Sequence, residues 1–159
     1  MWTATHSAVI PGLDKQAVWN AWADVNHWHL WDGDINSAEL LGEFAAGAQF
    51  VLHPKGGPKV KIDLVRAEPL VGYTDLCRFP LARMYGIHDM RDTPEGVELA
   101  ITIRVEGPLA WLWRKLVAQK VADEAPKQIA SLAAFAKSAA QTAVDVETVT
   151  SSDRVVNHA

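Results

Sequence analysis

The C-terminal part of the chain carries one apolar stripe at helical spacing, long enough to dictate how the rest is arranged. Gly107 and Pro108 precede it, and proline is tolerated in the first turn of a helix because its missing N–H would be unpaired there anyway. A helix over residues 109–137 would be about 40 Å long. Because Pro126 removes a backbone donor inside this run, we expect a kink or a short break there. The apolar stripe comprises Leu109, Leu112, Trp113, Leu116, Val117 and Val121, followed by Ile129, Leu132, Ala133 and Ala136.

The region before this helix, residues 35–106, is divided by regularly spaced Gly and Pro residues into short apolar-rich runs. Such punctuation is typical of successive antiparallel strands. In the runs Val60 to Val65 and Val97 to Val105, apolar side chains alternate with mostly polar ones. This alternation predicts strands with one buried face and one exposed face. Residues 2–10 alternate more loosely and predict a first strand, which Pro11 and Gly12 end.

Two short helical segments are expected between the first and second strands. Asp14 can cap the segment that follows it, in which Ala17, Val18, Ala21 and Trp22 recur at helical spacing. The next segment, NHWHLWDGD at 26–34, predicts a single turn that places Trp28 and Trp31 on the same side.

The order of these elements predicts an α+β fold, with one antiparallel sheet and one dominant helix. We expect six to seven strands in a curved sheet that wraps around the C-terminal helix. A hollow between the sheet and the helix is then the natural place for a functional site.

Residues 139–159 lose the helical periodicity and contain few large apolar groups. We therefore predict a domain over residues 1–138, followed by a flexible tail. The alternation of Val144 and Val146 with Asp145 and Glu147 leaves an added edge strand as the alternative.

A set of short motifs is distributed over residues 2–137. They are Ile10-Pro11, Ala17-Val18-Trp19, Ala23-Asp24-Val25, Trp28, Trp31-Asp32, Leu41-Gly42-Glu43-Phe44, Gly47, Glu68-Pro69, Thr93-Pro94-Glu95-Gly96, Val105-Glu106-Gly107-Pro108-Leu109-Ala110 and Pro126. With these motifs the chain resembles the SRPBCC, or START-like, superfamily, and within it the group described as polyketide cyclase/dehydrase and lipid transport. The resemblance implies the helix-grip fold of the birch pollen allergen, with Trp28 and Trp31 plugging one end of a cavity. It says little about the ligand, because the superfamily includes lipid carriers, hormone receptors and cyclases.

Composition argues against several classes of partner. Fifteen Lys and Arg against nineteen Asp and Glu give a net charge of -4, and no basic run is present that would neutralise a phosphate backbone, so we expect no nucleic-acid partner. No stretch is long and apolar enough for membrane insertion. The single cysteine, Cys77, excludes an internal disulfide, so a reducing, cytoplasmic location is expected. The oligomeric state is left open.

The segment at 26–34 also invites a metal-site hypothesis, because His27 and His29 are followed by Asp32 and Asp34. A metal needs three or four ligands that converge on one point. Two histidines two residues apart on a helical turn point about 200° away from each other. We therefore expect no metal here, and the chain lacks the phosphate-loop and zinc motifs that would indicate a cofactor.

His88 is the candidate polar residue of the cavity. It alternates with Met84 and Met90, and if this face is concave the imidazole would meet a ligand between two adaptable methionines. If instead the other face is concave, Tyr85 and Ile87 point inward. The pattern leaves both possibilities open, and it assigns Asp75 and Asp89 with the nearby arginines to a solvated outer face.

We expect a ligand to contact twelve residues, and we assign no catalytic residue among them. They are Phe50, Ile62, Leu64, Tyr73, Met84, His88, Met90, Ile101, Ile103, Trp28, Trp113 and Val117. The leading hypothesis is binding of a small hydrophobic molecule, such as a lipid, a polyketide or an aromatic compound. The alternative is a polyketide cyclase or dehydratase in which His88, Tyr73 or Tyr85 moves a proton. A third hypothesis is an adaptor whose groove binds a segment of a partner protein.

Overall fold

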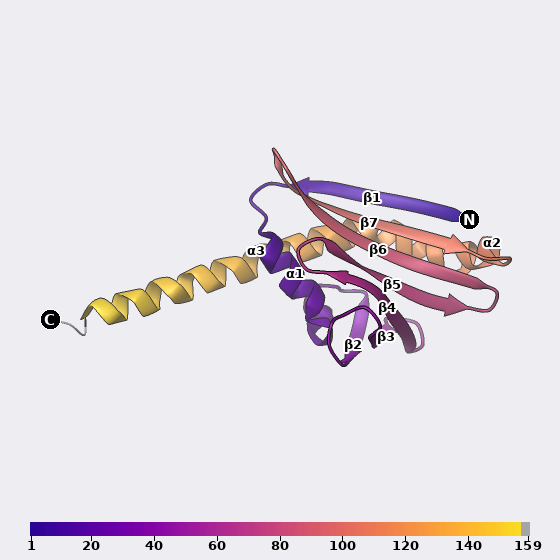
Figure 1. Cartoon of the computed structure of the whole chain (residues 1–159), viewed down its shortest axis with the longest axis horizontal. Helices are drawn as coiled ribbons and strands as arrows, with labels where there is room; N and C mark the ends of the chain where they lie inside the picture. The colour runs from indigo at the N-terminus through magenta and orange to yellow at the C-terminus, as the bar shows by residue number, and fades with distance from the viewer. Residues whose placement is uncertain (157–159) are drawn as a thin grey trace.

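A seven-stranded antiparallel sheet forms the body of the structure, a computed structural model that describes residues 1–156 (Figure 1). The strand order is β1-β7-β6-β5-β4-β3-β2, so β1 and β2 are the two edges. The strands are β1 (Trp2–Ile10), β2 (Ile35–Leu41), β3 (Gln49–Pro54), β4 (Val60–Glu68), β5 (Gly72–Phe79), β6 (Ala82–Thr93) and β7 (Gly96–Glu106).

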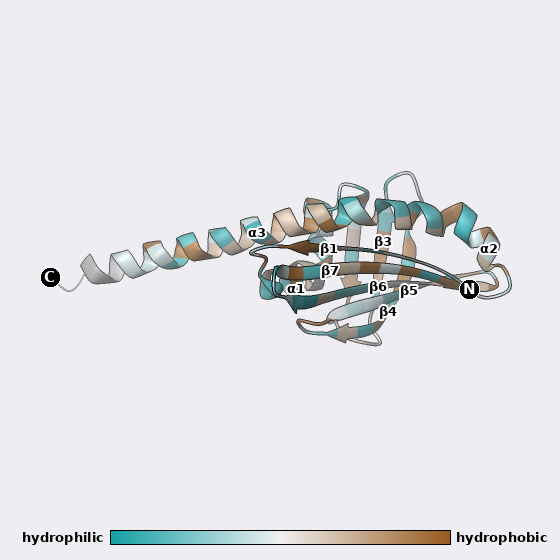
Figure 2. Ribbon diagram, turned by 90° about the horizontal axis from the view of Figure 1, so that it is seen from above, coloured by the Kyte–Doolittle hydropathy of each residue, from teal (hydrophilic) through white to brown (hydrophobic). Residues whose placement is uncertain are grey.

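Two short helices connect β1 to β2, and a nearly continuous helical run follows β7. They are α1 (Lys15–Ala23), the 3-10 helix η1 (Val25–Leu30), α2 (Ala110–Trp113), the π-helical turn η2 (Arg114–Ala118) and α3 (Gln119–Val156). The Asp14 side chain caps α1 by accepting a hydrogen bond from the backbone N–H of Gln16 at 3.1 Å. Figure 2 shows α3 lying along one face of the sheet, here called the inner face, and then projecting beyond it. The expected α+β architecture is confirmed.

The inner face of the sheet carries the core. Along β7, the five side chains that alternate inward are all buried, as their period of two predicts. They are Val97, Leu99, Ile101, Ile103 and Val105.

At the start of the C-terminal helical run, the residues that face the sheet differ from those of the predicted apolar stripe. Leu116 was expected to face the sheet, but its side chain is 62% exposed. The reason is the π-helical turn, in which the N–H of Gln119 donates to the carbonyl of Arg114, five residues back. This extra residue rotates Leu116 outward and brings Ala118 into the core.

The short break considered at Pro126 is not found, because α3 runs without interruption from Gln119 to Val156. The helix therefore also extends past residue 137, its predicted end. The edge strand considered for Val144 and Val146 is absent, since both residues are helical and exposed. Flexibility of the tail remains a prediction, and residues 157–159 lie outside the described part.

Candidate functional site

A pocket of about 310 Å³ lies between the inner face of the sheet and α3. It opens between the edge strand β1 and the helix, and small side chains on both sides leave the space. Its lining residues are Ala4, Thr5, His6, Ile101, Ile103, Gln119, Ala122, Asp123, Ala125 and Pro126. The pocket therefore combines an apolar floor from β7 with polar groups at its rim, as small-molecule sites commonly do.

A row of inner-face side chains runs from the pocket toward the centre of the sheet. The pairing register places His6 opposite Ile101, Ile101 opposite His88, and His88 opposite Tyr73. His88 is only 7% exposed, whereas Tyr85 lies on the outer face beneath the guanidinium of Arg104, 4.7 Å from its ring centroid. Of the two orientations that the sequence left open, the structure thus has His88 on the inner face and Tyr85 on the outer face.

Asp75 joins His88 on the inner face. Its strand position is opposite Gly86, and the carboxylate fills the space above that glycine, since a Cβ there would lie 2.8 Å from both carboxylate oxygens. Oδ2 of Asp75 lies 3.8 Å from Nδ1 of His88. In the part of the chain that the structure describes, this buried nitrogen has no hydrogen-bond partner.

Burial drives both members of this pair toward their neutral forms. It raises the pKa of Asp75 from 3.8 to about 7, with the backbone of Gly86 partly offsetting the effect. It lowers the pKa of His88 from 6.5 to about 4. Between about pH 4 and pH 7 the two groups are thus a neutral acid and a neutral base held close together, an arrangement that is suited to proton transfer.

An aromatic cluster encloses the pair on the side of α1 and η1. The Tyr73 ring stacks on the His88 ring at 4.2 Å between centroids and 6° between planes. Trp22 packs edge-on against Tyr73 at 5.3 Å, and Trp28 packs against Phe50 at 5.2 Å. Burial also raises the pKa of Tyr73 well above its ordinary value of 10.0, so its hydroxyl stays protonated.

The twelve predicted contact residues fall into three places. Ile101 and Ile103 line the pocket. Phe50, Ile62, Leu64, Tyr73, Met84, His88, Met90 and Trp28 belong to the core beside it. Ligand contact by any of these residues remains a prediction.

Trp113 and Val117 lie elsewhere. Trp113 stacks on Phe79 at 4.3 Å, and its Nε1 donates to the Pro80 carbonyl at 2.9 Å. It packs at one end of the sheet and does not line the pocket. Val117 lies in the π-helical turn, half-buried, and is also not among the pocket residues.

Two features of this site were not predicted from the sequence. Asp75 was assigned to the outer face, but its side chain is only 17% exposed and faces inward. Its alternation with Tyr73 and Cys77 was the available signal. Eight of the ten pocket residues, all except Ile101 and Ile103, were also not predicted. Ala4 and Ala122 show why, because small side chains signal space only once the facing element is known.

The polar segment at η1 has a structural role. Nδ1 of His27 pairs with the Asp24 carboxylate at 2.8 Å, and Asp32 accepts hydrogen bonds from the Asp34 backbone and from Gln128 on α3. Within residues 1–156, no group of three or more His, Cys, Asp or Glu side chains is arranged to hold a metal ion. No helix within the same residues combines the length and the apolar character that crossing a bilayer requires.

Comparison with known proteins identifies solved structures that are similar to this one. None of the curated proteins matches the chain. Among solved structures, the di-domain aromatase/cyclase StfQ of the steffimycin biosynthetic pathway is 13% identical with a TM-score of 0.70, over 87% of this chain and 51% of that one. The Zhui aromatase/cyclase from Streptomyces sp. R1128 is 16% identical with a TM-score of 0.65, over 86% and 93%. Ara h 8.0201 is 11% identical with a TM-score of 0.68, over 86% and 98%.

These likenesses establish the helix-grip fold, in which a curved sheet holds a long C-terminal helix. The sequence itself matches a family model over residues 1–137, a span that includes the whole sheet and the part of α3 that covers it. The chain therefore belongs to the polyketide cyclase/dehydrase and lipid transport family.

Proposed function

We propose that the protein binds a small hydrophobic ligand in the pocket between β1, β7 and α3. The observation that carries the proposal is the pocket itself, which has an apolar floor of Ile101 and Ile103 and a polar rim that includes His6 and Asp123. Its volume of about 310 Å³ is near the lower end of the usual range for ligand sites, roughly 300–1,000 Å³. A compact aromatic or polyketide-like molecule is therefore favoured over a large lipid.

Filling the pocket is the direct test. Ala122→Trp places a large ring in the pocket, whereas Ala134→Trp places the same ring on an exposed position of α3. With 1-aminoanthracene as a fluorescent probe, we expect saturable binding to the wild type and at least roughly tenfold weaker binding to Ala122→Trp, equivalent to about 1.4 kcal/mol. Ala134→Trp should bind like the wild type. Equal affinity of all three proteins would contradict the proposal, provided that thermal unfolding shows each one folded.

The buried acid and base favour a second candidate function, a cyclisation or dehydration of a polyketide-like substrate. Such a reaction needs a base to take a proton next to a carbonyl group and an acid to protonate the departing oxygen. Asp75 and His88 are suitable groups in chemistry and distance. His88 lies on β6, one strand away from the pocket strand β7, and Asp75 lies on β5, two strands away. A substrate would have to pass the Ile101 side chain to reach them.

The enzyme hypothesis predicts separate effects on binding and on turnover. In His88→Ala, we expect loss of cyclised or dehydrated product from a β-hydroxy ketone probe, while 1-aminoanthracene still binds. Product formation would be followed by mass spectrometry, with Met84→Leu as a control at a neighbouring inner-face position. If the wild-type protein forms no product above the background reaction, the binding function alone stands. The single cysteine, Cys77, is buried and free, which supports a cytoplasmic location for either function.

A further inference from the structure

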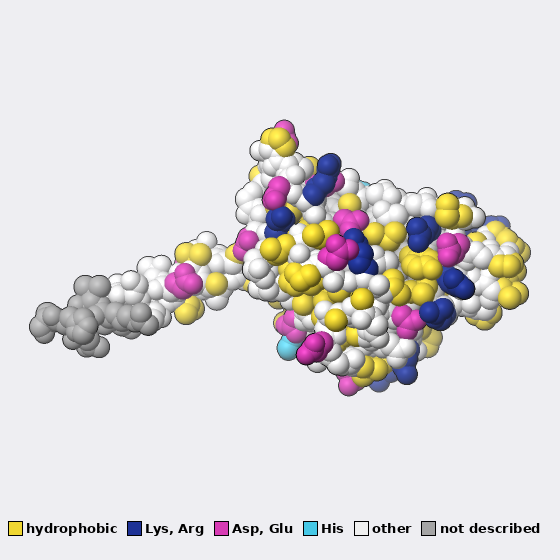
Figure 3. Space-filling view, viewed as in Figure 1, with side chains coloured by type: hydrophobic (Ala, Val, Ile, Leu, Met, Phe, Trp, Pro, Cys, Tyr) yellow, Lys and Arg dark blue, Asp and Glu magenta, His cyan; other side chains and the backbone are white. Residues whose placement is uncertain are grey.

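The end of the molecule opposite the projecting helix exposes three large apolar side chains. They are Leu81 at 65%, Trp111 at 61% and Leu116 at 62%, from the β5–β6 turn, α2 and η2 respectively. Two hydrogen bonds join the β5–β6 turn to the start of the helical run: Leu109 N–H donates to the Leu81 carbonyl at 3.1 Å, and Trp113 Nε1 donates to the Pro80 carbonyl at 2.9 Å. We call this region the α2 end. In Figure 3, hydrophobic side chains cap it, and Lys and Arg side chains lie beside them.

The exposure follows from ordered packing of the backbone. Trp113 is anchored by its stack on Phe79 and its bond to Pro80, and this anchoring leaves Trp111, two residues earlier, on the solvent side of α2. The π-helical turn then rotates Leu116 outward. Leu81 occupies a left-handed position with φ of 55° at the tip of its turn. All three apolar groups are thus held at the surface by defined local geometry.

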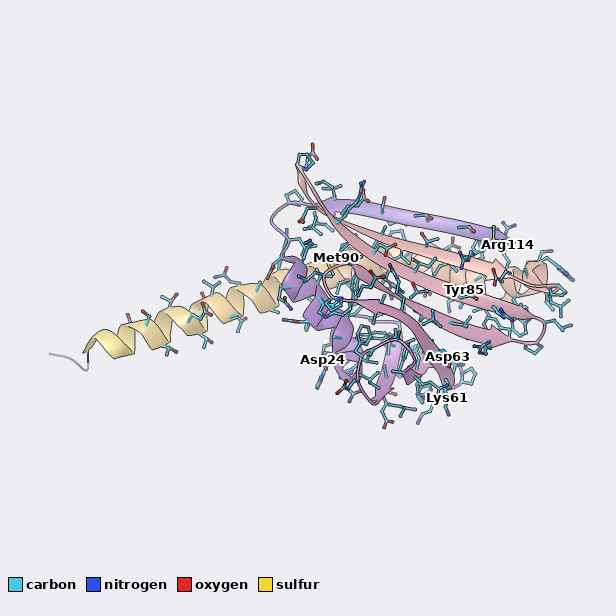
Figure 4. All side chains as sticks on the ribbon, in the orientation of Figure 1. Asp24, Lys61, Asp63, Tyr85, Met90 and Arg114 are labelled. Carbon is cyan, nitrogen blue, oxygen red and sulfur yellow. The ribbon has the colours of Figure 1, made fainter. Side chains whose placement is uncertain are left out.

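The charge around the α2 end is opposite in sign to that of the whole chain. Arg78 and Arg83 line a hollow of about 480 Å³ beside Leu81, together with Glu106. Arg114 lies over the Trp2 ring at 5.1 Å, and Lys115 is exposed next to it. Figure 4 shows Arg114 at this end of the sheet.

Two carboxylates accompany these four cations, since Asp63 pairs with Arg78 at 2.9 Å and Glu106 lines the hollow. The excess is therefore positive, although the chain carries a net charge of -4.

We propose that the α2 end docks on the surface of a membrane that contains anionic phospholipids. Trp111, Leu116 and Leu81 enter the boundary between head groups and acyl chains, while the neighbouring arginines and Lys115 contact the phosphates. Exposed Trp and Leu next to Arg and Lys are the combination that favours the membrane interface. Docking of this kind is peripheral, in agreement with the absence of a bilayer-spanning helix among residues 1–156.

The α2 end lies close to the pocket, so docking on a membrane would bring the pocket near the membrane surface. Leu116 precedes the pocket residue Gln119 by a single helical turn. A membrane-bound protein would hold its pocket close to the source of an apolar ligand. The docking proposal does not depend on ligand binding, because the surface and the pocket share none of the residues named for docking.

Vesicle sedimentation tests the proposal with the full chain. We expect binding to vesicles that mix phosphatidylcholine with phosphatidylglycerol, weakening as salt is added, and little binding to phosphatidylcholine alone. The double variant Trp111→Ser/Leu116→Ser should bind the mixed vesicles at least roughly tenfold more weakly. Leu30→Ser is the matched control, because Leu30 is 59% exposed on η1, which packs against β2 at the other edge of the sheet.

The charge contribution is tested separately with Arg114→Glu/Lys115→Glu, which should weaken binding to the mixed vesicles and reduce its salt dependence. All these positions are exposed, so the variants should unfold thermally like the wild type. The proposal is overturned if mixed and neutral vesicles bind equally, or if the Trp111→Ser/Leu116→Ser variant binds like Leu30→Ser. It is also overturned if the double variant instead abolishes self-association of the protein without vesicles.

Discussion

Asp75→Asn is expected to raise the free energy of unfolding by about 2–4 kcal/mol at about pH 8 and to change it little near pH 4. The Asp75 side chain is mostly buried, with 17% of it exposed, and its pKa in the folded protein is about 7 against an ordinary value of 3.8. At alkaline pH the folded wild type therefore carries a buried carboxylate without a cationic partner, which costs stability. Asparagine keeps the shape of the side chain, never ionises, and can donate its amide N–H to Nδ1 of His88.

The direction of the pH dependence follows from the two pKa values. The folded state binds the Asp75 proton more tightly than the unfolded state, so this contribution to stability is complete below pH 3.8 and is lost as the pH rises through about 7. For His88, the contribution is complete above 6.5 and is lost as the pH falls through about 4. The two trends oppose each other in the wild type. In Asp75→Asn, stability should rise between about pH 4 and 6.5, because only the His88 trend remains.

Urea unfolding followed by tryptophan fluorescence across this pH range measures both effects. Asp63→Asn is the matched control on the neighbouring strand and the outer face of the sheet. There, hydrogen bonds from Gln49 and Arg78 lower the pKa of the carboxyl group, so the substitution should destabilise the protein at neutral pH. A wild-type pH profile in Asp75→Asn would show that the carboxyl group is not buried as described.

Trp28→Ala is expected to lower the free energy of unfolding by about 3–5 kcal/mol. The ring is 5% exposed and packs edge-on against Phe50 at 5.2 Å, while its Nε1 donates to the Trp22 carbonyl at 3.0 Å. Removing it leaves a cavity under η1 and a buried carbonyl group without its donor, and both effects destabilise the folded state.

Trp111→Ala is the control for this substitution, since the same residue type is exposed at the α2 end. Its effect should stay within about 0.5 kcal/mol. Thermal and urea unfolding of the two variants would be compared at neutral pH. Equal stabilities would mean that the aromatic cluster around Tyr73 contributes nothing beyond what an exposed tryptophan does.

Periodicity was sufficient to predict the sheet and the part of the C-terminal helix that covers it, but not the continuation of α3 to Val156. The alternation along β7 identified its buried face residue by residue, and the stripe on the C-terminal helix correctly assigned Ile129, Leu132 and Ala136 to the core. Such patterns are reliable because burial of one face follows directly from the period of two or 3.6. The same argument failed at Leu116, since a π-helical turn changes the period without an evident mark in the sequence.

The site was less predictable, because it depends on which strands are neighbours. The orientation of His88 was undecidable from its own strand, and Asp75 became its partner only through the register between β5 and β6. Ala4 and Ala122 form opposite sides of the pocket although they lie far apart in the chain. Local sequence patterns contain no information on contacts of this kind.

For the ligand proposed above, the place of β1 at the edge of the sheet offers a route into the pocket. β1 forms one wall, and within the described residues it is hydrogen-bonded to a single strand, β7. Opening that wall requires separation of one ladder and of the contacts with α3, while the remaining six strands stay paired. Edge segments of this kind open with lower free energy than interior strands. We therefore expect amide hydrogens along Ala4 to Ala8 to exchange faster than those of β6.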